Sequence, residues 1–224
     1  MTLESNLINI VLVDTIHPGN IGSVARAMKT MGLKRLSLVN PRIFPSDDAV
    51  ALSGNATDVL KNATVYKSIK EAIKESTFVY ATSARDRSIQ WPIMNAEEAA
   101  NDIYKKTSSN KEISIIFGKE DRGLTNDELE LANKLIEIPA NPEYPVLNIA
   151  MSTQIICYEI LKASSNLENK KWRDYPEVNS EQLQILIDHF IDTAVDIDVI
   201  DPDNPKKIIS RIKRMFTRLQ PDEM

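Results

Sequence analysis

The sequence predicts an α/β fold, an open parallel sheet flanked by helices, followed by a small helical extension. Two observations carry this prediction. Six short runs of β-branched and other apolar residues alternate with helical patterns through the first two thirds of the chain, and beyond about residue 166 only helical patterns remain. Strands that alternate with helices are typical of a parallel sheet, because each crossover between parallel strands needs a long connection.

The predicted strands are the six apolar runs at 8–13 (INIVLV), 36–39 (LSLV), 64–66 (TVY), 78–81 (FVYA), 113–117 (ISIIF) and 135–138 (LIEI). The helical patterns between them cover 20–31, 57–62, 68–75, 95–106 and 125–134. The last of these should begin with a capping box, in which Thr125 is the N-cap and Glu128 the third helical residue.

The first helix should begin in a glycine turn and carry an arginine on its open face. Asn20 suits its N-cap, and Gly32 suits the left-handed residue that ends it. At about 100° per residue, Arg26 points away from the apolar stripe, into solvent or toward a group that needs a cation. That stripe follows the i, i+3, i+4, i+7 spacing of a buried face, at Ile21, Val24, Ala25 and Met28.

A second apolar helix closes the predicted domain. The run IAMSTQIICYEILKA after Asn148 is apolar nearly all round, so we expect it to be buried. It holds Cys157, the one cysteine of the chain, which we expect to be a reduced core thiol. The predicted domain spans residues 1–165, and residues 166–224 form a linker and a helical extension with helices at about 180–195 and 206–219.

Composition excludes several classes of protein. The 224 residues are 42% hydrophobic and 26% charged, which is ordinary for a globular protein. No apolar run approaches the roughly 18 residues of a membrane span, and the start, MTLESN, lacks the features of a signal peptide, so we expect a cytoplasmic protein without a membrane partner. Two distant histidines and one cysteine give no metal-ligand spacing, so no metal is expected.

The net charge of −5 gives no global case for nucleic-acid binding, but the charge is unevenly distributed. Seven acidic residues and no Lys or Arg lie between Glu181 and Asp203, whereas six basic residues and no acid lie between Lys206 and Arg218. The bases stand opposite an apolar stripe on the last helix, so they either track a nucleic-acid backbone, pair with the acidic helix before them, or are merely solvated. The residues of that basic face are Lys206, Lys207, Arg211, Lys213, Arg214 and Arg218.

Glycines and prolines gather where the predicted strands end. Gly19 and Gly22 follow the first strand, Gly118 and Gly123 follow ISIIF, and three prolines stiffen the loop IEIPANPEYPVLN at 136–148. Ligands of open α/β sheets sit outside the carboxyl ends of the strands, so these loops predict a pocket for a small molecule held largely by main-chain groups. The first turn is GxxG and no P-loop motif occurs, which makes a nicotinamide or P-loop nucleotide site a weak alternative.

Five ordered motifs resemble the TrmJ-type tRNA ribose 2′-O-methyltransferases of the SPOUT superfamily, over about residues 8–163. They are HPGNIGSVARAMKTMG (17–32), LVNP (38–41), ATSAR (81–85), FGKEDRGLT (117–125) and NPEYPVLNIAMSTQ (141–154). The later DPDNPKK and RIKRMF resemble the C-terminal helical extension of that family.

The resemblance implies a trefoil knot near the end of the α/β domain, a homodimer, S-adenosylmethionine as cofactor, and methylation of the ribose at position 32 in the anticodon loop of tRNA. It implies catalytic or site-shaping roles for Arg26, Asn20 and Glu120. Arg85, at the end of a predicted strand, is either an RNA-binding residue that meets phosphates or an ordinary surface charge. The residues that the resemblance places against the cofactor are Thr82, Ser83, Ala84, Gly118, Ile138, Pro145, Val146, Leu147 and Asn148.

The chemistry needs in-line alignment and a route for the proton of the ribose hydroxyl. A guanidinium stays protonated in proteins, so Arg26 is expected to grip a substrate phosphate and stabilise the developing alkoxide, while that phosphate or water takes the proton. One position departs from the family: a serine that usually precedes the Leu-Asn pair is replaced here by Val146, preceded by Pro145, so no role of that hydroxyl is carried over.

Two other functions stay open on the sequence. A relative could methylate a ribose of another RNA, such as ribosomal RNA, or could bind RNA without catalysis. Methyl transfer into bulk tRNA, followed by mapping of the nucleotide, separates these alternatives.

Overall fold

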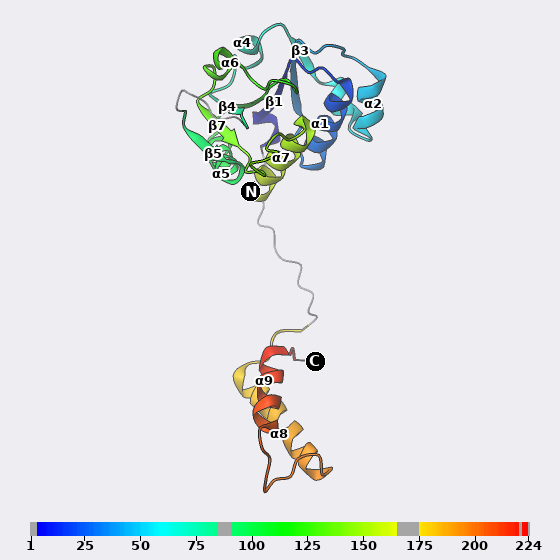
Figure 1. The fold of residues 1–224 in the computed structure, drawn as a ribbon, viewed down its shortest axis with the longest axis vertical. Coiled ribbons are helices and arrows are strands. Elements are labelled where there is room, and N and C mark those ends of the chain that lie inside the picture. The colour runs from blue at the N-terminus through cyan, green and yellow to red at the C-terminus, as the bar shows by residue number, and fades with distance from the viewer. Residues whose placement is uncertain (1–3, 85–90, 165–174, 220, 224) are drawn as a thin grey trace. The chain divides into compact units, whose positions relative to one another are not determined.

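The computed structural model describes residues 4–84, 91–164, 175–219 and 221–223. By the contacts among its residues the chain divides into two compact units, Met1–Leu167 and Glu168–Met224. The first unit is a parallel sheet flanked by helices and the second is helical, which confirms the predicted fold class of each part (Figure 1). The predicted boundary between residues 165 and 166 lies outside the described residues.

The first unit is built on one seven-stranded sheet in the order β3-β2-β1-β6-β4-β7-β5, with every neighbouring pair parallel. All six predicted strands are present within a residue of their expected ends. The strand that was not predicted, β5, has three residues at the edge of the sheet beside β7, too few for a periodic pattern. The strands are β1 (Ile8–Val13), β2 (Arg35–Val39), β3 (Thr64–Tyr66), β4 (Phe78–Thr82), β5 (Ile93–Asn95), β6 (Ile113–Phe117) and β7 (Lys134–Glu137).

Helices cover both faces of this sheet (Figure 1). Their bounds are α1 (Pro18–Thr30), α2 (Asp47–Ser53), α3 (Thr57–Lys61), α4 (Ile69–Ala72), α5 (Ala96–Thr107), α6 (Asn126–Leu129) and α7 (Ile149–Ser164). Alternate residues of a strand point to opposite faces, so Ile10 and Leu12 of β1 pack under α1, α5 and α7, whereas Val11 and Val13 pack under α4 and α6. This alternation places one core on each side of the sheet.

The start of α1 corrects the predicted cap. The N-cap is His17 and the helix begins at Pro18, whose fixed φ and missing N–H suit the first helical position. Asn20 therefore lies inside the first turn and its side chain is free to serve another purpose. At the other end Gly32 has φ of +80°, which confirms the predicted left-handed stop.

A short helix that was not predicted, α2, packs directly on α1. Ser46 caps it by accepting from the amide of Asp48, a signal that the sequence does contain. The two helices approach so closely that a Cβ at Gly22 would lie 2.1 Å from the carbonyl oxygen of Ala49. Only glycine fits at that crossing.

The other helices confirm the expected positions more closely than the expected lengths. Thr125 and Glu128 form the predicted capping box, but α6 has four residues and α4 also has four, both far shorter than predicted. The prediction that the helix after Asn148 is buried all round is wrong, because Met151 and Tyr158 of α7 are exposed. Cys157 is buried as expected, and burial raises the pKa of its thiol to about 12.

The second unit consists of two helices, α8 (Ser180–Asp196) and α9 (Ile208–Leu219). Phe190 and Phe216 hold them together through an edge-on ring contact with centroids 5.2 Å apart. The end of the chain returns to the segment before α8, where the amide of Val178 donates to the carbonyl of Pro221 at 3.2 Å. None of the helices in the described ranges is long and apolar enough to cross a membrane.

Candidate active site

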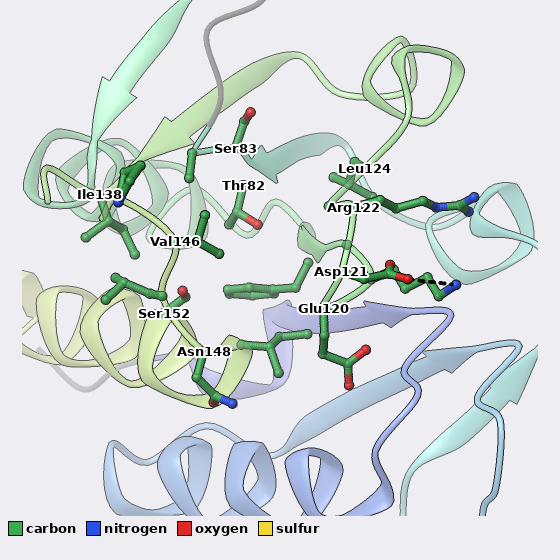
Figure 2. Close-up of a pocket in the computed structure, with 18 of the residues that line it drawn as sticks. Thr82, Ser83, Glu120, Asp121, Arg122, Leu124, Ile138, Val146, Asn148 and Ser152 are labelled. Atoms are coloured by element: carbon green, nitrogen blue, oxygen red, sulfur yellow. Dashed lines mark ion pairs between the residues drawn. The ribbon is translucent and has the colours of Figure 1, made fainter. Parts of the chain in front are cut away.

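A pocket of about 420 Å³ opens at the carboxyl ends of β4, β6 and β7, beside the start of α1 and of α7 (Figure 2). It lies next to the β1/β6 pair, where the chain changes the direction in which it builds the sheet. Such a switch point is where ligands of open α/β sheets bind, and the volume falls within the usual range of small-molecule sites.

Most of the predicted site residues meet in this pocket. Asn20 and Glu120 line it together with every residue that the sequence assigned to the cofactor: Thr82, Ser83, Ala84, Gly118, Ile138, Pro145, Val146, Leu147 and Asn148. Arg26 does not line it, and Arg85 lies outside the described residues. The basic residues of the last helix belong to the second unit.

The end of β4 is held between its two neighbours. The Thr82 hydroxyl donates to the carbonyl of Ile116 in β6 at 3.2 Å, and the amide of Ser83 donates to the carbonyl of Ile136 in β7 at 3.1 Å. These bonds fix the backbone of 82–84 against one wall of the pocket. The hydroxyl of Thr82 is therefore already engaged, and Thr82 contributes its backbone position and its methyl group to the pocket.

The loop after β6 is a tight turn that forms another wall. The amide of Gly123 donates to the carbonyl of Lys119 at 2.8 Å, with Gly123 in the left-handed region at φ of +68°. A Cβ on Gly118 would lie 2.3 Å from the amide nitrogen of Leu124, so no side chain fits where the loop closes. Glycine at these two positions is what allows the turn to fold back on itself.

Glu120 leaves this turn and reaches the start of α1 (Figure 2). Its carboxylate accepts from the amide of Ile16 at 2.9 Å, from the amide of His17 at 3.2 Å, and from the side-chain amide of Asn20 at 3.0 Å. Burial alone would raise the pKa of this carboxyl, but these hydrogen bonds outweigh it and hold the pKa below its usual value. Glu120 thus anchors the residues that lead into the helix of the first motif, while the helix that follows Glu120 has its own capping box.

Asn148 extends this connection to α7. Its Nδ2 donates to Oδ1 of Asn20 at 3.1 Å, and its Oδ1 accepts from the amide of Ala150 at 2.8 Å. Asn148 therefore caps α7 and also binds Asn20. Glu120, Asn20 and Asn148 form one chain of hydrogen bonds that ties together three loops far apart in sequence.

Several lining residues escaped the sequence analysis. Lys119 lies 3.5 Å from Asp121, and Arg122 pairs with Asp14 at 3.1 Å, so both cations of the turn are engaged by carboxylates. In Figure 2 Arg122 points away from the hollow. The other missed lining residues include Tyr144 and Ser152. Their signal was their place within the FGKEDRGLT and NPEYPVLNIAMSTQ motifs.

Arg26 lies on the exposed side of α1, six residues beyond Asn20. Its side chain passes the turn after α2, where its Cδ would stand 4.0 Å from a Cβ built on Gly54. Six residues correspond to about 240° around a helix, so Asn20 and Arg26 leave α1 in different directions. Within one chain the guanidinium and the pocket are thus separate.

The basic face of the second unit is exposed. Lys206, Lys207, Lys213 and Arg214 form no ion pair with any described residue, nor do Arg211 and Arg218. The alternative in which they pair with the acidic helix before them is therefore not observed. Among the residues that the structure describes there is also no cluster of three His, Cys, Asp or Glu that could hold a metal.

Residues 7–158 match the SpoU rRNA Methylase family, and residues 181–224 match the C-terminal domain of the tRNA methyltransferase TrmJ. The chain is 38% identical to the tRNA (cytidine/uridine/adenosine-2'-O-)-methyltransferase TrmJ of Pseudomonas aeruginosa, over 94% of this chain and 86% of that protein. It is 40% identical to the tRNA (cytidine/uridine-2'-O-)-methyltransferase TrmJ of Pectobacterium atrosepticum, over 96% and 90%. The crystal structure of TrmJ from Z. mobilis is similar with a TM-score of 0.80 and 31% identity, covering 96% of this chain and 92% of that one.

Proposed function

The chain belongs to the SpoU rRNA methylase family, and on that premise we propose that it methylates the ribose of nucleotide 32 in the anticodon loop of tRNA. It is a tRNA 2′-O-methyltransferase that uses S-adenosylmethionine. Two relatives that match over nearly its whole length are both named for this reaction on tRNA. Position 32 is the finer part of the proposal and rests on the resemblance of the five motifs.

The observation that supports the proposed site most strongly is the convergence of its residues. Nine residues from four separate stretches of sequence, each expected at the cofactor, line a single pocket of about 420 Å³. The pocket is lined by apolar side chains such as Ile138 and Leu147 and by polar groups such as Glu120 and Lys119, which fits a ligand with an apolar adenine and a charged amino-acid end. When bound, S-adenosylmethionine supplies an electrophilic methyl group.

The residues of this chain supply position and charge. Glu120, Asn20 and Asn148 hold the start of α1 against the β6–α6 and β7–α7 loops, so that the substrate hydroxyl enters a site with fixed walls. Arg26 grips a phosphate beside the target ribose and stabilises the oxyanion that develops, and that phosphate or water accepts the hydroxyl proton.

The separation of Arg26 from its own pocket supports the proposed homodimer, in which Arg26 serves the pocket of the partner subunit. The helices α2 and α7 both contact α1 and both carry exposed apolar side chains that a second copy could cover: Val50, Leu52, Met151 and Tyr158. An Arg26→Ala chain and an Asn148→Ala chain, each inactive alone, should regain activity when mixed, because one of the two sites in the mixed dimer is then intact. Mixtures that stay inactive would contradict a shared site.

The trefoil knot and the cytoplasmic location remain parts of the proposal. The β6–α6 and β7–α7 loops both line the pocket, which is the arrangement that a knot in this region requires. Cytoplasm is proposed because the substrate is tRNA.

The test of the function is methyl transfer from labelled S-adenosylmethionine into unmodified tRNA, followed by mapping of the labelled nucleotide. The expected product carries one 2′-O-methyl group at nucleotide 32, and a tRNA with a 2′-deoxy sugar there should accept none. A label at another nucleotide would overturn the position, and a label in ribosomal RNA alone would overturn the substrate. Cofactor binding without transfer to any RNA would favour a binding relative.

A further inference from the structure

Ser152 is a pocket residue to which no role has been given. It lies on the first turn of α7, four residues after Asn148, so both side chains leave the same face of the helix. It is half-buried, and in Figure 2 its side chain points into the same hollow as those of Val146 and Thr82.

The hydroxyl of Ser152 has no hydrogen-bond partner among the described residues. Helical serines and threonines commonly bond back to the carbonyl four residues earlier, and the adjacent Thr153 does so, donating to Ile149 at 2.8 Å. Ser152 does not, although its own amide donates to the carbonyl of Asn148. A hydroxyl turned away from its helix and left unpaired in a half-buried place is suited to bind a ligand.

The surroundings of this hydroxyl indicate which part of a ligand it meets. Figure 2 shows Ile138, Val146 and Ser152 at one end of the pocket, and Glu120, Asp121 and Arg122 at the other. Of the three residues at the first end, two are apolar and Ser152 carries a hydroxyl, which suits a flat aromatic base with polar atoms at its edge, whereas the second end is charged and suits an amino-acid group or a phosphate. Thr82 and Asn148 already use their polar groups within the protein.

We propose that the Ser152 hydroxyl hydrogen-bonds to the adenosyl half of the bound cofactor and fixes its orientation at the apolar end of the pocket. This inference rests on the proposed cofactor site. A hydrogen bond to one polar atom of a ligand on an otherwise apolar wall orients that ligand and rejects analogues that lack the atom.

The test is the affinity of Ser152→Ala for two ligands, S-adenosylhomocysteine and 5′-methylthioadenosine, measured by titration calorimetry on the full chain. Both ligands contain the adenosyl half, but only the first carries the amino-acid half. The variant should weaken both by about the same factor, roughly five- to tenfold for one lost hydrogen bond. Alanine is a better helix former than serine, so α7 should not lose stability. Ser210→Ala, a helical serine of the second unit, is the matched control and should bind both ligands like the unmodified chain.

Four outcomes would decide against the proposal or separate it from the function. Unchanged affinity for both ligands would overturn it, and so would a loss confined to S-adenosylhomocysteine, which would move the contact to the amino-acid half. A variant that keeps its cofactor affinity but shows a raised KM for tRNA would assign Ser152 to the substrate instead. Failure of the unmodified chain to bind either ligand would instead contradict the proposed function.

Discussion

The two units of this chain present their functional groups in opposite ways. In the first unit the pocket is assembled from loops more than 100 residues apart, such as those that carry Asn20 and Asn148, and its side chains hold one another through directed hydrogen bonds. In the second unit the basic residues stand on the exposed face of α9, without ion pairs to the described residues. The first arrangement needs the whole fold, whereas the second needs only a helix.

The cores of the two units differ in the same sense. In the first unit, buried apolar side chains fill both faces of the sheet. In the described part of the second unit, the buried apolar residues are only Ile187, Ala194 and Ile200. Precise placement of a reacting atom requires the rigidity of a packed core, and attraction to a phosphate backbone does not. We therefore expect mutations in the first unit to change catalysis steeply, and mutations in the second to change affinity gradually.

The largest effect is expected at Arg26. Arg26→Ala should reduce methyl transfer at least about 100-fold, because a charge aimed at the developing oxyanion is lost. Arg26→Lys should retain some tRNA binding but lose most turnover, since an ammonium cannot replace the two-pronged guanidinium. Single-turnover methyl transfer and tRNA affinity measure the two quantities, and Lys34→Ala, which removes another exposed cation, serves as control. An active lysine variant would argue against the fork geometry.

The next effect is expected at Glu120. Glu120→Gln removes the charged acceptor of three N–H groups, and we expect about a tenfold loss of activity together with a loss of about 1–3 kcal/mol in the free energy of unfolding. Urea unfolding at pH 7 measures the second quantity. Unaltered stability would mean that α1 keeps its place without this carboxylate.

The same residue gives a pH dependence. Because the folded protein holds the pKa of Glu120 below the ordinary 4.5, its contribution to stability is complete above that pH and declines as the pH falls through the lowered folded pKa. Urea midpoints measured from pH 6 down to pH 3 should therefore fall more steeply for the unmodified chain than for Glu120→Gln. Parallel curves would show that this carboxyl is not perturbed.

A smaller effect is expected in the second unit. The double variant Lys213→Gln, Arg214→Gln should weaken tRNA binding several-fold and reduce the slope of log affinity against log salt by about 1–2, without changing affinity for S-adenosylhomocysteine. A matched pair in the first unit, Lys67→Gln with Lys70→Gln, removes the same charge from another exposed surface. Equal slopes for both double variants would mean that the α9 face does not lie on RNA.

The smallest effect is expected from removing the second unit altogether. A chain that ends at Ser164 should bind S-adenosylhomocysteine within about twofold of the full chain, because every described residue of the pocket lies before that point. Calorimetric titration of both chains measures this. A large loss of affinity would show that the first unit does not form the cofactor pocket by itself and that the helices of the second unit complete it.

The sequence predicted those features that depend on local patterns. All six predicted strands, the Thr125 capping box and the left-handed Gly32 follow from periodicity and turn chemistry, and each is observed. The N-cap of α1 was misassigned because the chain enters the helix at Ile16 and His17, whose amides are held by Glu120 about 100 residues away, a contact that no local pattern records. The three-residue β5 was missed because so short a strand has no period.

The residues of the candidate site show the same division between features set by local sequence and features set by tertiary packing. Motif resemblance identified the residues that line the pocket, since each motif is a short continuous stretch. It did not show that Arg26 stands apart from that pocket, or that Ser152 turns its hydroxyl into it, because both facts depend on how helices are rotated in the folded chain. Direction, unlike position, is decided by tertiary packing.

The bare crossing of α1 and α2 has a mechanical consequence. At Gly22 the two backbones meet with no room for a methyl group. The two helices therefore cannot slide past each other without steric collision, and they move as one rigid unit. Arg26 and the exposed apolar side chains of α2 belong to that same rigid unit. Even the addition of a single carbon at residue 22 should force the helices apart and shift Arg26 away from the position in which it is proposed to meet RNA.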